Sequence, residues 1–187
     1  MKILVSAFEP FMNINTNSSY EIVKKINSQH ELLKVYLPVH LTNSFKILQE
    51  KISEFNPDII ILCGQAASRN KISIETKAIN LIGKSISNTD GITTENSQII
   101  PNANNAYYSS FPTVEALSSL LYEDIPVELS NDAGTYICNS LFYQAMHFYP
   151  NIESVFIHFP LYKNQINDLG IELNVLIKGL ETIINSL

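Results

Sequence analysis

Two hydrophobic periodicities alternate along the chain. Short, mostly apolar runs are typical of strands inside a sheet, and apolar residues spaced three and four apart are typical of the helices that cover it. The predicted strands are 2–6, 32–39, 58–63, 72–81, 127–130 and 154–159. The predicted helices are 18–26, 42–55, 112–121, 135–149 and 165–187, and the polar stretch 83–110 predicts a long loop. Strands that alternate with helices predict the α/β class, as a three-layer α/β/α sandwich with a mixed, largely parallel sheet.

The predicted strand 72–81 differs from the others because it carries a carboxylate among apolar residues. Ile72 and Ile74 face one side of such a strand, and Ser73 and Glu75 face the other. Glu75 is therefore either an exposed charge that protects an edge strand from aggregation or a buried group held by a partner.

Composition narrows the class of protein. A chain of 187 residues with 45% hydrophobic and 16% charged residues predicts one globular domain over residues 1–187. The net charge of −6 excludes an overall basic surface for nucleic acid or an anionic membrane. No apolar run approaches the roughly 20 residues of a membrane span. The N-terminus enters a predicted strand directly, without a segment typical of secretory signals, so a cytoplasmic location is expected.

Cysteine and histidine residues are few, and their spacing is unlike that of metal ligands. Cys63 and Cys138 are far apart and form no CxxC pair, and the four His residues show no HExxH spacing. The chain also has no glycine-rich phosphate loop, which argues against a nucleoside-binding module. We therefore expect no metal, no cofactor and no disulfide framework.

One cysteine and one histidine are predicted to meet. Cys138 lies near the start of helix 135–149, and His158 lies near the end of strand 154–159. In a parallel α/β sheet, helix starts and strand ends share one edge, where such folds bind ligands. A thiol in the first turn of a helix, capped by Asp132 or Thr135 and close to an imidazole, is an activated nucleophile. The alternative is core packing, because Cys138 also heads the apolar stripe of its helix.

Other residues at the same edge are suited to support such a pair. Glu75 is a candidate to orient the imidazole. Gln65 follows strand 58–63 and offers an amide that can hydrogen bond to a bound amide. Phe8 and Phe11 follow the first strand and are candidate walls of an apolar pocket, whereas Cys63 is interpreted as a packing residue.

Four segments resemble, in this order, the pyroglutamyl peptidase type I (pyrrolidone-carboxylate peptidase) family. Residues 8–11, Phe-Glu-Pro-Phe, match the signature that follows the family's opening strand. Residues 64–80 resemble the segment of the catalytic Glu, 130–139 the segment of the nucleophile, and 156–160 that of the catalytic His. The resemblance runs from Met1 to the C-terminal helix.

The resemblance implies a cysteine-type omega-peptidase with the triad Glu75, Cys138 and His158. Cys138 would attack the carbonyl of an N-terminal pyroglutamyl residue, His158 would transfer the proton, and the thioester would be hydrolysed. The substrates would be peptides with N-terminal pyroglutamate, and the family typically forms homo-oligomers, here a dimer or tetramer. The positions that match the family's substrate pocket are Phe8, Phe11, Gln65, Ile86, Tyr136 and Ile137.

The sequence also departs from the family pattern. Met12 and Asn13 replace two glycines, and Thr76 replaces the usual arginine after the catalytic Glu. Ser85 stands where the family has an arginine, with Lys84 beside it. Losing a charged donor at an oxyanion site can cost on the order of 100-fold or more in rate. The alternatives are thus a slow or non-catalytic homologue that binds pyroglutamyl or other small acyl ligands, and a cysteine hydrolase for another acyl group.

Overall fold

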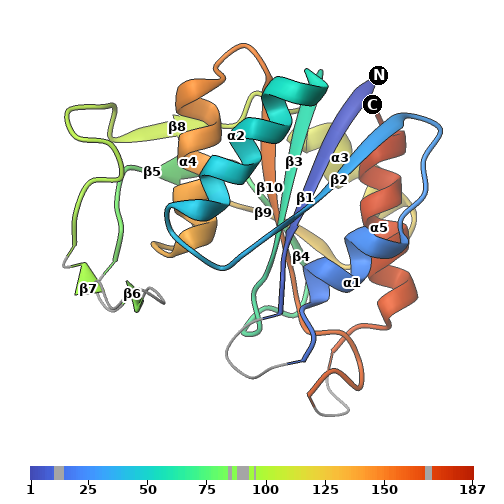
Figure 1. The fold of residues 1–187 in the computed structure, drawn as a ribbon. Coiled ribbons are helices and arrows are strands. Elements are labelled where there is room, and N and C mark those ends of the chain that lie inside the picture. Colours follow the sequence, from blue (N-terminus) through green and yellow to red (C-terminus); the bar gives the residue numbers. More distant parts are fainter. Residues whose placement is uncertain (11–14, 84–85, 88–92, 95, 167–169) are drawn as a thin grey trace.

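The computed structural model describes residues 1–10, 15–83, 86–87, 93–94, 96–166 and 170–187. A six-stranded sheet lies between two layers of helices (Figure 1). One layer contains α1 (Ser18–Lys25), α3 (Thr113–Tyr122) and α5 (Leu173–Asn185), and the other contains α2 (Asn43–Phe55) and α4 (Ile137–Phe148). This arrangement confirms the predicted three-layer α/β/α sandwich.

The central sheet is mixed, with four strands running in one direction and two in the other. Its order is β2 (Glu31–Leu37), β1 (Lys2–Phe8), β3 (Ile59–Gln65), β10 (Glu153–Phe159), β4 (Ile72–Glu75) and β9 (Val127–Ser130). Only the pairing of β10 with β4 is antiparallel within this sheet. The carboxyl ends of β1, β3 and β10 therefore lie at one edge, as the sequence predicted.

The strands separate two hydrophobic cores because successive side chains point to opposite faces. On β10, Val155, Ile157 and Phe159 pack into the core under α1, α3 and α5. Phe156 packs into the core under α2 and α4, and His158 shares its face. The predicted sidedness of this strand is therefore confirmed.

The predicted single strand 72–81 is wrong, because the structure divides it between two sheets. At Thr76 the backbone N–H and the hydroxyl both donate to the Ser130 carbonyl, 2.7 and 3.0 Å away. The chain then leaves the central sheet as β5 (Lys77–Ile79), which pairs with β8 (Ala106–Tyr108). The region predicted as a loop thus contains β8 and a second small pair, β6 (Ile86–Ser87) with β7 (Thr93–Thr94).

The predicted helix 165–187 is also too long at its start. The α5 helix begins at Leu173, and the segment before it folds back on the end of β10. Ile171 bridges to Tyr162, and Gly170 has φ of 118°, in the left-handed region that favours glycine. A Cβ at Gly170 would also collide with the Leu161 carbonyl, so the close approach of these two segments requires glycine.

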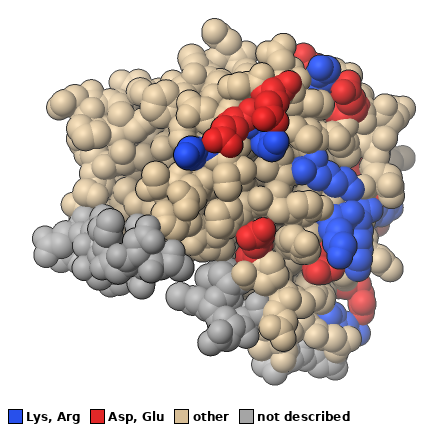
Figure 2. Space-filling model, in the orientation of Figure 1, with Lys and Arg blue, Asp and Glu red and all other residues tan. Residues whose placement is uncertain are grey.

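Surface charge on the face shown in Figure 2 is mixed in sign, with basic and acidic side chains interspersed. This face therefore lacks, among the described residues, the continuous basic surface of a nucleic-acid-binding protein. Within the described part of the chain, no helix has both the length and the apolarity needed to cross a membrane.

Candidate active site

The site is built where β3 and β10 end side by side. In their parallel register, Gly64 of β3 lies opposite His158 of β10. Gly64 has no side chain to fill the space above the sheet, and the Cys138 thiol approaches it. A Cβ built on Gly64 would lie 3.1 Å from Cys138 Sγ. The strand register and this close approach bring the Cys138 and His158 segments together at one edge of the sheet, as the sequence predicted.

Cys138 is the second residue of α4, which confirms its predicted place in the first helical turn. The predicted cap is wrong, because the N-cap is Tyr136 and its side chain makes no capping hydrogen bond. Asp132 instead accepts a hydrogen bond from the Gly134 N–H at 3.0 Å, which shapes the loop before the helix. The first-turn N–H groups of α4 consequently have no side-chain cap.

Glu75 and His158 form a buried pair. Glu75 is fully buried, and His158 is 5% exposed. The His158 Nδ1 lies 2.8 Å from Glu75 Oε1. Since a carboxylate accepts, Nδ1 carries the proton of this hydrogen bond, which leaves Nε2 of a neutral ring as a base. The interpretation of Glu75 as an exposed edge charge is therefore wrong, and a partner holds it.

Arg69 is a residue of this site that the sequence analysis missed. Its Nη1 lies 2.8 Å from Glu75 Oε1, as an ion pair outside hydrogen-bond geometry. Its Nη2 donates to the Asp132 carbonyl at 2.8 Å, in the loop that leads to Cys138. A signal was present: the chain has twelve Lys and Arg residues, and Arg69 is the only arginine.

The two cysteines have different surroundings. Cys63 lies within the core and is 1% exposed, as predicted for a packing residue, whereas Cys138 is half-buried. The pKa of the Cys138 thiol is raised to about 12, chiefly by burial and to a smaller extent by the Glu75 carboxylate. Its own backbone N–H and Arg69 act in the opposite direction, lowering the pKa. Burial outweighs them, so the resting thiol keeps its proton near neutral pH.

A small pocket opens beside the thiol. The empty space between its lining residues is about 310 Å³, and this volume includes solvent space at the open mouth. Four of the pocket residues predicted from the family resemblance line it, and Asn17 and Val39, which were not predicted, complete the lining with Cys138. Phe11 lies outside the described residues, and Ile86 lies in β6 without a described side chain. The predicted residues that line the pocket are Phe8, Gln65, Tyr136 and Ile137.

The orientation of the Gln65 amide follows from its partners. The Ser18 backbone N–H, which can only donate, lies 2.8 Å from one amide atom of Gln65, so that atom is the oxygen. Gln165 Nε2 donates to the same oxygen at 2.6 Å. The Gln165 oxygen in turn accepts from the Tyr162 N–H at 3.1 Å. The Gln65 oxygen is thus engaged twice, and its NH₂ group is the end available to a ligand in the pocket.

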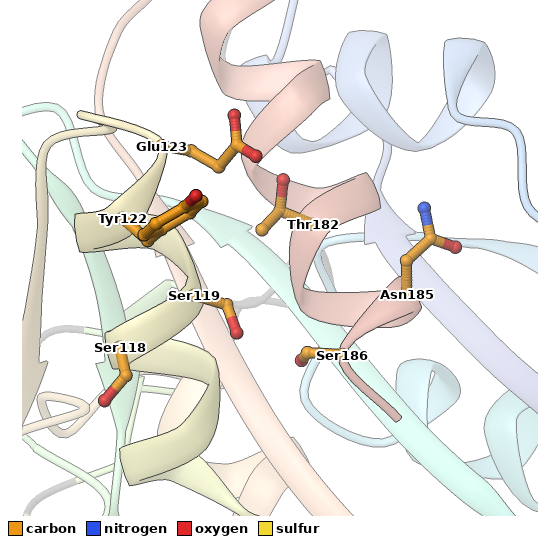
Figure 3. Close-up of a pocket in the computed structure, with 7 residues that line it drawn as sticks. All are labelled: Ser118, Ser119, Tyr122, Glu123, Thr182, Asn185 and Ser186. Carbon is orange, nitrogen blue, oxygen red and sulfur yellow. The ribbon is translucent and has the colours of Figure 1, made fainter.

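A larger hollow lies between α3 and α5, on the opposite face of the sheet (Figure 3). It holds about 860 Å³ of empty space but contains no Cys or His. Ser118, Ser119 and Ser186 line it, and each hydroxyl donates to a carbonyl of its own helix. The three serine hydroxyls of this hollow are therefore engaged within their own helices. Among the described residues, no group of three or more His, Cys, Asp or Glu side chains is placed to hold a metal ion.

Comparison with known sequences gives a consistent result over the whole chain. A family model described as "Pyroglutamyl peptidase" matches residues 1–187. A pyrrolidone-carboxylate peptidase of Thermosipho melanesiensis is 39% identical, with 100% of this chain and 95% of the relative aligned. One of Thermococcus onnurineus is 33% identical over 100% of this chain and 98% of the relative.

Solved structures agree with the sequence comparison. A variant of the pyrrolidone carboxyl peptidase of Pyrococcus furiosus superposes with a TM-score of 0.92 at 29% identity, covering 100% of this chain and 97% of the other. Pyroglutamyl peptidase I of Bacillus amyloliquefaciens gives a TM-score of 0.91 at 31% identity, covering 99% and 93% of the two chains. The pocket and the buried pair thus lie within a fold shared along its full length.

Proposed function

Because this chain belongs to the pyroglutamyl peptidase family, we propose that it is a cysteine peptidase that removes N-terminal pyroglutamyl residues from peptides. The observation that carries the proposal is the buried hydrogen bond between His158 and Glu75. His158 lies on β10, next to β3, whose Gly64 the Cys138 thiol approaches. A carboxylate that orients an imidazole near a thiol is the arrangement of a nucleophilic triad.

The proposed reaction passes through a thioester. Cys138 Sγ attacks the pyroglutamyl carbonyl carbon as His158 Nε2 takes the thiol proton. His158 then gives this proton to the leaving amine as the peptide bond breaks, and water hydrolyses the thioester to release pyroglutamate and restore the thiol. Since burial raises the pKa of the Cys138 thiol to about 12, proton removal accompanies attack instead of preceding it.

The start of α4 supports stabilisation of the oxyanion that forms during attack. Its first-turn N–H groups have no side-chain cap and lie at the positive end of the helix dipole. The Cys138 N–H already favours negative charge on the adjacent sulfur, since it lowers the thiol pKa against the effect of burial. Donors of this kind, fixed before reaction, are an effective oxyanion hole.

The pocket supports recognition of a lactam ring. Phe8 and Ile137, both nearly fully buried, provide apolar walls. The Gln65 NH₂ group, left free by the two donors on its oxygen, is suited to donate to the lactam carbonyl. Phe11 and Ile86 remain predicted members of the pocket.

The proposal is tested by release of a fluorophore from a pyroglutamyl amide. We expect turnover by the native protein, loss of turnover in Cys138→Ala, and retained turnover in Cys63→Ala, the matched control. A prolyl amide, which lacks the lactam carbonyl, should not be cleaved. Equal cleavage of both amides, or activity that survives Cys138→Ala, would refute the proposal.

The alternative of a non-catalytic homologue finds no support in the comparisons, because the relatives reported above are named as peptidases. Of the residues that motivated it, Met12, Asn13, Lys84 and Ser85 lie outside the described residues, whereas Thr76 is described and donates to the Ser130 carbonyl. Cytoplasmic location and assembly into a homo-oligomer stay predictions from sequence.

A further inference from the structure

The only arginine of the chain lies against the buried carboxylate of the site. Eleven of the twelve basic side chains are lysines, yet the residue in contact with Glu75 is Arg69. A guanidinium has a fixed planar fork and can serve two acceptors at once, which an ammonium on a flexible stem does less well. The two acceptors here are Glu75 Oε1 and the Asp132 carbonyl.

Glu75 needs a cation if it is to stay charged. It is fully buried, and its Oε2 has no hydrogen-bond partner among the described residues. The titratable or charged groups that face it are Arg69 from the β3–β4 connection, His158 from β10 and Cys138 from α4. Along β9, Glu128 bonds instead to Ser73. A neutral imidazole offers one hydrogen bond but no charge, so Arg69 is the compensating cation.

The same side chain joins two parts of the site. Arg69 reaches Glu75 with one nitrogen and the Asp132 carbonyl with the other. The loop that contains Asp132 leads through Tyr136 into the first turn of α4, where Cys138 lies. Arg69 therefore connects the element that orients the base with the element that carries the nucleophile.

We propose that Arg69 is a positioning residue of the triad, which holds the buried Glu75 carboxylate in place and fixes the loop before Cys138 relative to it. It acts through Glu75 and Asp132 and does not touch the substrate. The inference rests on the proposed function for its assay substrate only. Losing the orienting carboxylate of a serine protease triad costs about 10⁴-fold, and Arg69 lies one contact farther, so we expect a loss of about 10- to 100-fold.

The test compares Arg69→Met, Arg69→Lys and Arg69→Ala with Lys71→Met, which removes an exposed cation from the same segment. We expect Arg69→Met to lower kcat by about 10- to 100-fold with KM within about twofold. Arg69→Lys should be intermediate, and Lys71→Met should resemble the native protein.

Two further measurements separate positioning from simple stabilisation of the fold. Low millimolar guanidinium ion should restore part of the activity of Arg69→Ala, since the 21% exposure of the side chain gives the ion access. In a Glu75→Gln background, Arg69→Met should cost little more, because its partner charge is already absent. A lower melting temperature with unchanged kcat, or an undiminished loss in the Glu75→Gln background, would overturn the proposal.

A readout that needs no peptide substrate distinguishes failure of this inference from failure of the proposed function. If the native protein does not cleave pyroglutamyl amides, the rate of Cys138 alkylation by iodoacetamide is measured against pH instead. We expect alkylation of Arg69→Met to be slower than that of the native protein, since Arg69 lowers the pKa of the Cys138 thiol. An unchanged alkylation profile would overturn the role of Arg69 whatever the substrate.

Discussion

Gly64 is the position at which a single methyl group tests the geometry of the site. A Cβ added there would lie 2.8 Å from Phe156 Cζ and 3.1 Å from Cys138 Sγ. Carbon atoms in contact normally lie about 3.5–4.0 Å apart, so one of the neighbours has to move by about 0.7 Å or more. Gly64→Ala therefore displaces the Cys138 thiol or the Phe156 ring.

The Phe156 ring has little room to move away. It is fully buried, and its centroid lies 6.1 Å from that of Phe142 and 4.7 Å from that of His158. Movement of the ring thus transmits to the imidazole. A displacement of about 1 Å at a reacting group can cost on the order of 100-fold in rate, and we expect a loss in kcat of that order for Gly64→Ala.

Stability is the less sensitive readout for this variant. Overpacking costs about 1–3 kcal/mol, but replacing a glycine also restricts the unfolded chain and recovers about 0.4–1 kcal/mol. A net loss of about 2 kcal/mol or less corresponds to a melting temperature lower by about 8 °C or less for a chain of this size. Activity should thus fall far more than the folded fraction does.

The assay is steady-state cleavage of a pyroglutamyl amide, with melting temperature measured on the same samples. Gly179→Ala is the matched control: its Cβ would collide with Ile72 Cδ1 in the core on the other face of the sheet. We expect it to keep the native kcat whatever its melting temperature. A Gly64→Ala protein with native kcat and KM would refute the placement of the thiol against this glycine.

Three further predictions follow from the contacts of the site. The rate of Cys138 alkylation by iodoacetamide should rise throughout pH 7–10 without a plateau, because burial raises the thiol pKa to about 12. Cys63, which is buried, should stay unmodified. A plateau near pH 8 in rates measured by mass spectrometry would contradict this prediction. Gln165→Leu should loosen the Gln65 amide and raise KM by about tenfold at constant kcat; an unchanged KM would argue against the amide pair. Asn139→Ala removes hydrogen bonds to three backbone groups near β5 and should lower the free energy of unfolding by about 1–3 kcal/mol in urea titrations.

Most strands, and the edge where Cys138 and His158 lie, could be predicted because buried segments show a regular spacing of apolar residues. Cys138 and His158 could be placed together from the rule that helix starts and strand ends share an edge. The division at Thr76 was missed, although three consecutive polar residues, 75–77, interrupt the alternation there. What ends the strand is a pair of hydrogen bonds from Thr76 to Ser130, which depends on a partner strand distant in sequence.

Polar partnerships were the least predictable part of the site. Gln65 and Gln165 lie 100 residues apart, and nothing in either segment indicates that the two amides meet. Glu75 alone was compatible with both exposure and burial, because spacing within one strand does not reveal what covers it. Arg69 illustrates a different kind of signal: rarity of a residue type within one chain singles out a position without saying what it contacts.

Because Arg69 is the only arginine, its accessibility can be measured by chemistry that is selective for arginine. A reagent that prefers arginine, such as phenylglyoxal, has one guanidinium to modify in all 187 residues, and that side chain is 21% exposed beside the buried carboxylate. A protease that cuts only after arginine likewise has one bond to cleave, between Arg69 and Asn70. The extent of labelling or cutting at that one point therefore measures how far this part of the sheet edge opens, without an engineered reporter group.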